Sequence, residues 1–236
     1  MSEASTAKAL PVYLQIAELL GRQIKAGYWR AGERLPTEAE LAKRLDVAVG
    51  TLRKSLALLS DQGVLERVQG SGTYVKKVSG TGQIYELFRL ELNQGPGLPT
   101  AQILDVTHTR KAGDLPAQLG EDLWRVRRLR YLSQVPVALE EIWFPAVGSE
   151  RLKPSDLGDS MYLFYQQRYG IWIARVEDQL SAAAVPTWTR APLTWQPQAC
   201  AGFIERYSWT AANQLAEFSR TWFDPKVCRY TSRLSQ

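Results

Sequence analysis

The stretch that decides the fold runs from Leu35 to Val75 and reads LPTEAELAKRLDVAVGTLRKSLALLSDQGVLERVQGSGTYV. Near its start, Thr37 followed three residues later by Glu40 forms the capping box that begins many helices. Leucines recur at helical spacing in a second segment, about 48–62, and Gly63 suits the left-handed conformation that ends a helix. The stretch therefore predicts two short helices joined by a tight turn.

Two strand-like runs, about 64–68 and 73–77, follow these helices and flank a glycine-rich tip at 70–72. An amphipathic segment at about 11–26 precedes them and is expected to form a further helix, with Pro11 in its first turn. Three helices followed by a β-hairpin, or wing, are typical of DNA-binding domains whose third helix enters a major groove. We expect this arrangement over residues 1–77.

The polar face of the third helix carries candidate DNA contacts near its amino-terminal end, the end that a recognition helix inserts into a groove. A glycine-rich wing tip lets the backbone approach a phosphate or a minor groove closely. The same tip also serves any tight hairpin, so the glycines alone do not prove DNA contact. The expected DNA-binding residues are Thr37, Glu38, Thr51, Arg53, Lys54, Gln69, Gly70, Ser71 and Gly72.

The segment 12–75 resembles the winged helix-turn-helix domain of the GntR family of bacterial transcription regulators. The resemblance rests on ordered phrases: YLQIAELLGRQIKAG, GERLPTEAELA, TLRKSLALLSDQGVLE and QGSGTYV. It implies sequence-specific binding to double-stranded DNA. This chain departs from the family pattern at Ala39, Ala48 and Val49, where relatives carry side chains that touch bases or phosphates. An operator sequence therefore does not transfer from those relatives.

Composition and charge placement agree with an anionic polymer as the partner. The 236 residues are 45% hydrophobic and 22% charged, which are globular values. Of the net charge of +5, residues 1–80 contribute +4, with 12 Lys and Arg against 8 Asp and Glu. A solvated basic face without function would give the same excess, but its coincidence with the helix-turn-helix pattern favours DNA.

Several other classes of protein are excluded by what the sequence contains. No apolar run approaches the roughly 18 residues of a membrane span, and the first ten residues lack a secretion signal, so we expect a cytoplasmic protein. Cys200 and Cys228 are expected to be free thiols. His108 is the sole histidine, which argues against histidine-based catalytic triads and metal sites. No cofactor is expected.

A segment rich in Gly, Ser and Thr, 78–83, predicts a linker to a second domain at 84–236. Strand-like runs dominate that domain, and helical patterns at 116–119 and 161–169 fall between them, with a weaker turn or short helix at 187–192. We predict an α+β fold with a mostly antiparallel sheet. The predicted strands are 102–109, 123–132, 137–144, 173–182, 202–210 and 217–223.

Charged residues in these strands indicate an anion-binding site. Arg128 and Arg130 alternate on one strand and therefore face the same side, as a clamp of two guanidinium groups. Ser160 lies at an expected helix start, where backbone N–H groups favour negative charge. Glu140 and Glu217 sit among apolar strand neighbours and need partners. A ligand site and a purely structural ion-pair network both explain this pattern.

The second domain also resembles the effector-binding (UTRA) domain of the HutC-type branch of the same family, which shares the chorismate-lyase fold. The resemblance rests on the phrases RRLR at 127–130, PVALEE at 136–141, DSMY at 159–162 and AEFSR at 216–220. It implies that Arg128, Arg130, Ser160 and Tyr162 hold a phosphate, and that Glu140 and Glu217 reach sugar hydroxyl or amino groups. Among eight tryptophans, most are expected in the core; Trp143, on the strand of Glu140, is the chosen candidate for the effector site.

The sequence thus predicts a metabolite-responsive transcription regulator, a repressor acting as a homodimer on paired half-sites. An enzyme of chorismate-lyase-like fold is the competing class, although a fold alone does not confer activity. A protein that merely binds a partner through its second domain is the third. The carboxylates of Glu140 and Glu141 do not form a glycosidase pair, because adjacent strand residues face opposite sides.

Overall fold

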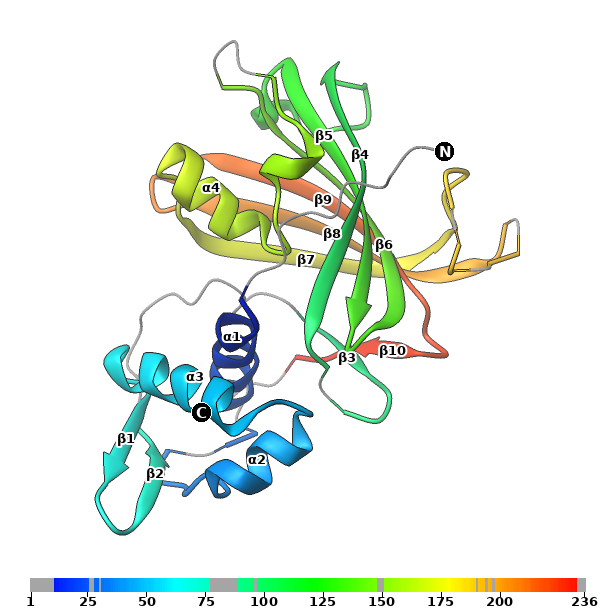
Figure 1. Ribbon diagram of the computed structural model, residues 1–236. Helices are drawn as coiled ribbons and strands as arrows, with labels where there is room; N and C mark the ends of the chain where they lie inside the picture. Colours follow the sequence, from blue (N-terminus) through cyan, green and yellow to red (C-terminus); the bar gives the residue numbers. More distant parts are fainter. Residues whose placement is uncertain are drawn as a thin grey trace. The chain divides into compact units, whose positions relative to one another are not determined.

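The computed structural model describes residues 11–25, 28–29, 31–76, 89–95, 97–147, 151–189, 191–193, 195–196 and 198–232 (Figure 1). The chain forms two compact units, whose boundaries within the described residues lie between Arg89 and Leu90 and between Tyr230 and Thr231. The predicted linker at 78–83 lies outside the described residues. None of the helices in the described ranges combines the length and the hydropathy that a membrane span requires.

The amino-terminal unit contains three helices and a hairpin, as the sequence predicts. The helices are α1 (Val12–Lys25), α2 (Glu38–Arg44) and α3 (Val49–Asp61), and the hairpin pairs β1 (Leu65–Val68) with β2 (Gly72–Val75). One face of each helix contributes to a single apolar core, which explains why such short elements are stable together. Its buried members include Ile16, Leu20, Leu41, Leu52, Leu56, Leu59, Val64 and Val75.

Polar contacts fix how these helices begin and cross. Thr37 is the N-cap of α2, and the reciprocal hydrogen bonds of the capping box are present, with Thr37 N 2.9 Å from Glu40 Oε2. The buried Ser55 of α3 donates to the carbonyl of Tyr13 on α1 at 2.7 Å. By contrast, Ala48 caps α3 without a side-chain hydrogen bond, because alanine replaces the usual polar residue.

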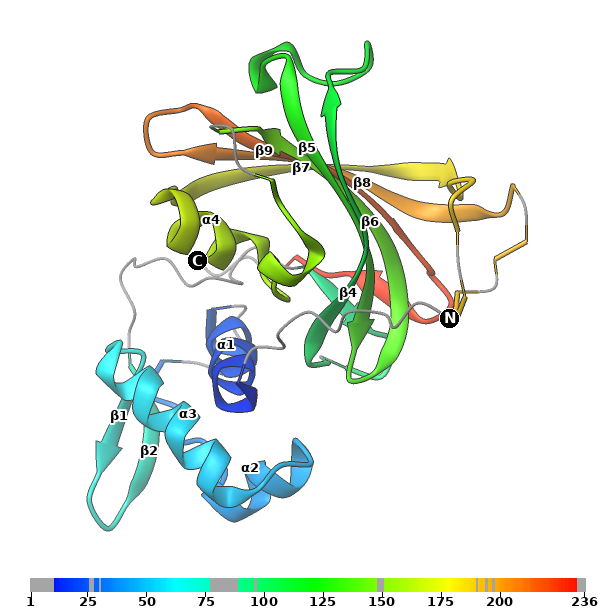
Figure 2. The same ribbon diagram turned by 45° about the horizontal axis from the view of Figure 1, so that its top comes forward.

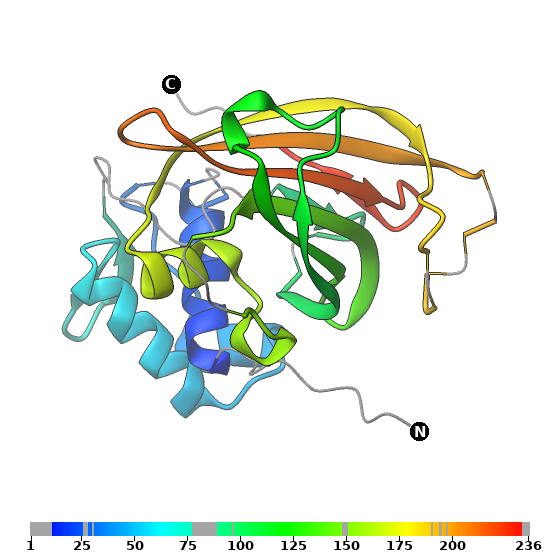
Figure 3. The same cartoon turned by 90° about the horizontal axis from the view of Figure 1, so that it is seen from above.

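The carboxyl-terminal unit is built on a six-stranded antiparallel sheet, which confirms the predicted α+β class. The strands are curved rather than flat (Figure 3). All six predicted strand runs lie within observed strands. In spatial order these are β4 (Pro99–Arg110), β5 (Asp122–Leu132), β6 (Val135–Pro145), β9 (Leu215–Phe223), β8 (Cys200–Thr210) and β7 (Ile173–Ala184).

Helix α4 (Met161–Tyr169) matches its prediction, and the segment predicted at 116–119 forms a single 3₁₀ turn, η1 (Ala117–Leu119). The described part of 187–192 contains turns and no helix. The sequence reading missed a second 3₁₀ turn, η2 (Pro154–Asp156), and a two-stranded ribbon that pairs β3 (Leu90–Leu92) with β10 (Cys228–Tyr230). Three-residue strands are too short to show an alternating pattern.

The sheet has two differently covered faces. On the helix face, α4 packs against the sheet (Figure 2), with Phe164 and Tyr165 of the helix beside Val126, Ile142 and Phe144 of the strands. We call the other side the outer face; it carries a second set of buried apolar side chains. Strand alternation sends Glu140 to the helix face and Glu141 to the outer face, as expected.

Candidate DNA interface and effector site

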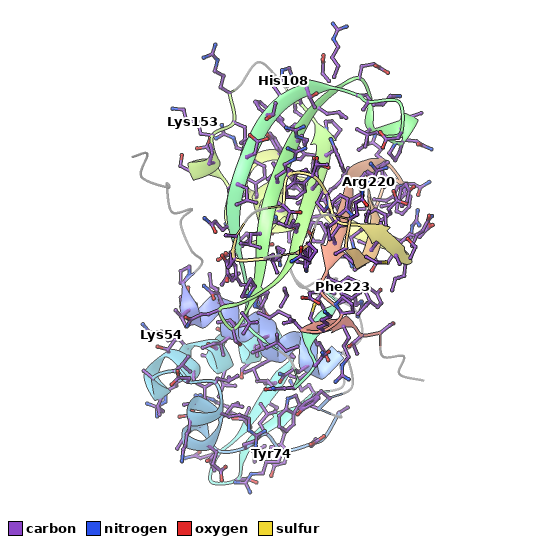
Figure 4. The ribbon with its side chains drawn as sticks, turned by 90° about the vertical axis from the view of Figure 1, so that its right-hand side faces the viewer. Lys54, Tyr74, His108, Lys153, Arg220 and Phe223 are labelled. Atoms are coloured by element: carbon purple, nitrogen blue, oxygen red, sulfur yellow. The ribbon has the colours of Figure 1, made fainter. Side chains whose placement is uncertain are left out.

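The predicted contacts on α3 are accessible in the amino-terminal unit. Arg53 and Lys54 are exposed and Thr51 is half-buried, all within the first two turns of the helix. Figure 4 shows Lys54 on this helix and Tyr74 on the wing strand β2. Val49, one of the departures from the family pattern, is also exposed at the start of α3.

The wing tip combines exposed polar residues with glycines that its geometry requires. Gln69 and Gly70 are exposed, and the Ser71 hydroxyl lies 2.6 Å from the Tyr74 hydroxyl. Gly72 has a φ of 134°, and a Cβ there would come 2.7 Å from Arg34 Nε. A larger residue at 72 would therefore strain the backbone and displace the side chain packed on the tip.

Glu38 joins the recognition helix to the wing. Its carboxylate accepts from Arg53 of α3 and from Arg67 of β1, each at 2.9 Å. The sequence analysis predicted Glu38 as a DNA contact and did not include Arg67. An anionic side chain is repelled by phosphates, whereas the two guanidinium groups that it orients are attracted to them. Thr37 likewise serves the capping of α2.

In the carboxyl-terminal unit, the structure brings the predicted clamp together on the helix face. Arg128 and Arg130 are each only 3% exposed. Arg128 Nε donates to Glu140 Oε2 at 2.9 Å across the β5–β6 pair, and Arg130 Nη1 lies 3.8 Å from the same oxygen. Burial disfavours a charged Glu140, but these guanidinium groups outweigh burial and hold the pKa of Glu140 below its usual value.

The start of α4 completes the clamp. The backbone carbonyl of Asp159 accepts from Arg128 at 3.2 Å and from Arg130 at 3.3 Å. The Asp159 carboxylate is held by the backbone N–H of Ala101 at 2.8 Å. Ser160 is the buried N-cap of α4 and accepts from the N–H of Leu163. Two arginines and a helix start therefore converge on one place, as the sequence predicts.

A second carboxylate, Glu217 on β9, lies in the same layer between the sheet and α4. The Tyr165 hydroxyl donates to Glu217 at 2.6 Å, and the Ser208 hydroxyl donates to its other oxygen at 3.3 Å. Tyr162, a predicted phosphate ligand, lies 3.0 Å from Ser208 through its hydroxyl. Burial raises the pKa of Glu217 to about 7. This carboxyl group can thus donate or accept a hydrogen bond near neutral pH.

A third guanidinium group in this layer was missed by sequence reading. Arg206 on β8 forms a bidentate pair with Asp178 on β7, at 2.6 and 2.7 Å, and interacts electrostatically with Tyr162. Arg206 and Ser208 are two residues apart on one strand, as Arg128 and Arg130 are. This spacing is the sequence signal that could have identified Arg206. The sequence does not reveal the strand register that brings β8 across β9 to the clamp.

The structure corrects the choice of Trp143 for the effector site. Trp143 is three residues from Glu140, so strand alternation places it on the outer face. There it stacks on Phe218 with ring centroids 5.8 Å apart, and Arg220 lies 5.5 Å from its ring. Figure 4 shows Arg220 on β9. Lying on the same strand as Glu140 did not mean lying on the same face.

Comparison with known proteins agrees with both halves of this arrangement. The model of "Bacterial regulatory proteins, gntR family" matches residues 12–75, and that of the UTRA domain matches residues 97–228. The HTH-type transcriptional regulator SmoD of Agrobacterium fabrum strain C58 is 43% identical over 97% of this chain and 98% of its own length. The chain belongs to the GntR family.

A further curated relative and a solved structure are also similar to this chain. The mannosyl-D-glycerate transport/metabolism system repressor MngR of Escherichia coli K12 is 34% identical over 72% of this chain and 73% of its own. Among solved structures, the possible transcriptional regulator YydK of Bacillus subtilis has a TM-score of 0.55 at 21% identity, covering 94% of this chain and 99% of that one, and shows the same fold.

These relatives establish the class of the protein. The GntR chain described here is a DNA-binding transcription regulator whose UTRA domain responds to a small-molecule effector. The competing enzyme interpretation finds no support among them. Within the described residues, no three His, Cys, Asp or Glu side chains gather as a metal site.

Proposed function

We propose that this GntR regulator is a homodimeric repressor that leaves its operator when a small anionic, hydroxyl-bearing metabolite binds between α4 and the sheet. The observation that carries the proposal is the convergence of Arg128 and Arg130 on the start of α4 beside Glu140. Buried charges are costly to maintain without a partner, so such a gathering favours a ligand of matching charge.

The proposed ligand chemistry follows from the donor set. Guanidinium groups are forks of N–H donors that match the oxygens of a phosphate or carboxylate. Glu140 and Glu217 supply acceptors for hydroxyl groups, and the Tyr162, Tyr165 and Ser208 hydroxyls add adaptable partners. A sugar phosphate, a sugar acid or an organic acid satisfies this set. The name of MngR refers to mannosyl-D-glycerate, a sugar that bears a carboxylate.

The homodimer is proposed from the DNA side. Winged helix-turn-helix domains commonly bind as pairs on half-sites about one helical turn apart. A single domain with Ala39, Ala48 and Val49 in place of polar contacts would bind an operator weakly. In this scheme the effector lowers operator affinity by favouring a different spacing of the two DNA-binding domains, and it does so only through unequal affinity for the two arrangements.

Thermal-shift screening of the full chain against anionic metabolites tests this proposal. We expect a sugar phosphate or sugar acid to raise the melting temperature of the wild type and to weaken its binding to promoter DNA. Arg130→Ala should lose the shift. Arg127→Ala, on the same strand but paired with Glu141 on the outer face, is the matched control and should keep it. A shift retained by Arg130→Ala and lost by Arg127→Ala would refute the site.

A further inference from the structure

The β3–β10 ribbon is the passage through which the chain enters and leaves the carboxyl-terminal unit. Leu90 pairs with Tyr230 and Leu92 with Cys228. Within the described residues, the two boundaries between the units fall at the end of this ribbon, beside Leu90 and beside Tyr230. The backbone N–H of Thr231 continues the pairing by donating to the carbonyl of Arg89 at 2.8 Å. In the part of the chain that the structure describes, a signal carried along the chain between the units therefore passes this ribbon.

Two side chains of β10 fasten the ribbon to the rest of the domain, and they differ in kind. Cys228 is fully buried, and its thiol lies 3.7 Å from the carbonyl oxygen of Val137 on β6. The Tyr230 hydroxyl donates to Asp178 on β7 at 2.7 Å. The first is a fully buried side chain with only a weak hydrogen bond. The second is a hydrogen bond to a charged group, whose strength depends on what else that group binds.

Asp178 is the group that connects the ribbon with the effector residues. Its carboxylate holds Arg206 through both oxygens, while Oδ2 also accepts from Tyr230. Arg206 in turn interacts electrostatically with Tyr162 of α4. Arg206, which lies beside the candidate effector residues, is therefore joined to the ribbon through Asp178. Hydrogen bonds in such a chain polarise one another, so a change at one end alters the strength at the other.

We infer that Tyr230 and Asp178 are the positioning pair that couples the effector site to the DNA-binding unit. The inference rests on the proposed function. An anion near Arg206 shares that guanidinium group with Asp178, which leaves the carboxylate a stronger acceptor for Tyr230 and tightens the ribbon. Because coupling between two sites is reciprocal, operator DNA must in turn alter the residues around Arg206.

A purely structural role for Tyr230 makes a different prediction. If the hydroxyl only pins the ribbon, its loss loosens the ribbon locally but leaves communication between the two sites intact. The deciding quantity is therefore the response of one site to the other, and not the stability of either. Operator DNA is a suitable trigger, because it acts on the DNA-binding unit without requiring a known effector.

Hydrogen exchange followed by mass spectrometry on the full chain makes this measurement. The duplex is one that the wild type selects from its own genomic DNA. Peptides covering α4 and β8 are compared with and without it. In the wild type, operator binding should change their exchange rates. In Tyr230→Phe this change should fall about five-fold or more, in keeping with typical coupling factors. Asp178→Asn should reduce the change in the same way, so either variant can serve if the other proves unstable.

Tyr131→Phe is the matched control, because its hydroxyl donates to Gln102 at 3.2 Å, outside this chain of contacts. In this variant, operator DNA should change the exchange rates of α4 and β8 as much as it does in the wild type. Full transmission in Tyr230→Phe, or no response of α4 and β8 in the wild type, would overturn the inference. The proposed effector chemistry is tested separately by the thermal-shift screen. If that chemistry is wrong, no anionic compound will raise the melting temperature.

Discussion

The carboxylate of Glu140 lies 2.9 Å from Arg128 Nε on the neighbouring strand, in a layer where both side chains are almost entirely buried. This carboxylate is an internal counter-ion, and the proposed anionic effector has to share the guanidinium groups with it. Competition of this kind tunes affinity: the pair satisfies the arginines when effector is absent and limits how tightly simple anions bind.

Glu140→Gln is expected to lower stability and to create a response to simple anions. Breaking a buried ion pair by removing one charge costs about 3–5 kcal/mol. Phosphate or sulfate should then fill the place of the carboxylate and recover part of the loss, by about 2.7 kcal/mol at a concentration of a hundred times Kd. Thermal melts in chloride and in phosphate buffers measure both effects.

Glu141→Gln is the control for that experiment, since Glu141 pairs with Arg127 at 2.7 Å on the outer face. It removes the same charge from the next residue along the strand. Its melting temperature should not depend on phosphate more than that of the wild type. Equal anion rescue of both variants would show that the effect is general screening and not occupation of the clamp.

Glu217 should make stability depend on pH. Burial raises its pKa to about 7 from an ordinary value of 4.5, so between these pH values the folded protein holds a proton that the unfolded chain releases. The contribution to stability is therefore full below pH 4.5 and is lost as pH rises through 7. Urea unfolding at several pH values gives the free energy of unfolding of the wild type and of Glu217→Gln. The difference between the two isolates the contribution of Glu217.

The free energy of unfolding of the wild type, relative to that of Glu217→Gln, should fall as pH rises and should be lowest above pH 7. Glu121→Gln, at a side chain that is 77% exposed, is the control. A difference that stays constant from pH 5 to pH 8 would mean that Glu217 is ionised throughout.

Arg67 should prove to be a DNA contact that Glu38 orients. Arg67→Ala is expected to weaken binding to all duplexes and to reduce the slope of log affinity against log salt by about one. Glu38→Gln should raise affinity for random DNA, because two guanidinium groups lose their counter-ion, and lower the preference for the operator. Fluorescence anisotropy over a salt series reads out both. Glu66→Gln, exposed on β1, removes the same charge; if it reproduces the Glu38→Gln result, net charge is the cause.

Trp143 should matter for stability and not for the effector. Trp143→Ala is expected to lower the free energy of unfolding by about 3–5 kcal/mol, because it empties a packed position beside Phe218. Trp143→Phe should cost less and keep the ligand-induced thermal shift unchanged. A well-folded Trp143→Phe protein without that shift would return the residue to the effector site.

Local patterns predicted the elements well because each pattern reports a local preference. The Thr37–Glu40 capping box placed the start of α2, and alternation placed Arg128 and Arg130 on one face. What sequence reading missed depends on partners far along the chain. Arg206 joins the candidate effector residues only through strand register, and Tyr230 meets Asp178 across 52 residues. The error with Trp143 was one of parity, since three residues along a strand reverse the face.

We expect the two-arginine clamp of Arg128 and Arg130 to control DNA binding. The most direct measurement is operator affinity of the wild type and of Arg130→Ala, with and without the anionic compound that gives the largest thermal shift. We predict that the compound weakens operator binding of the wild type, and that Arg130→Ala binds the operator equally well in both conditions. An Arg130→Ala protein that still releases DNA on adding the compound would contradict the account.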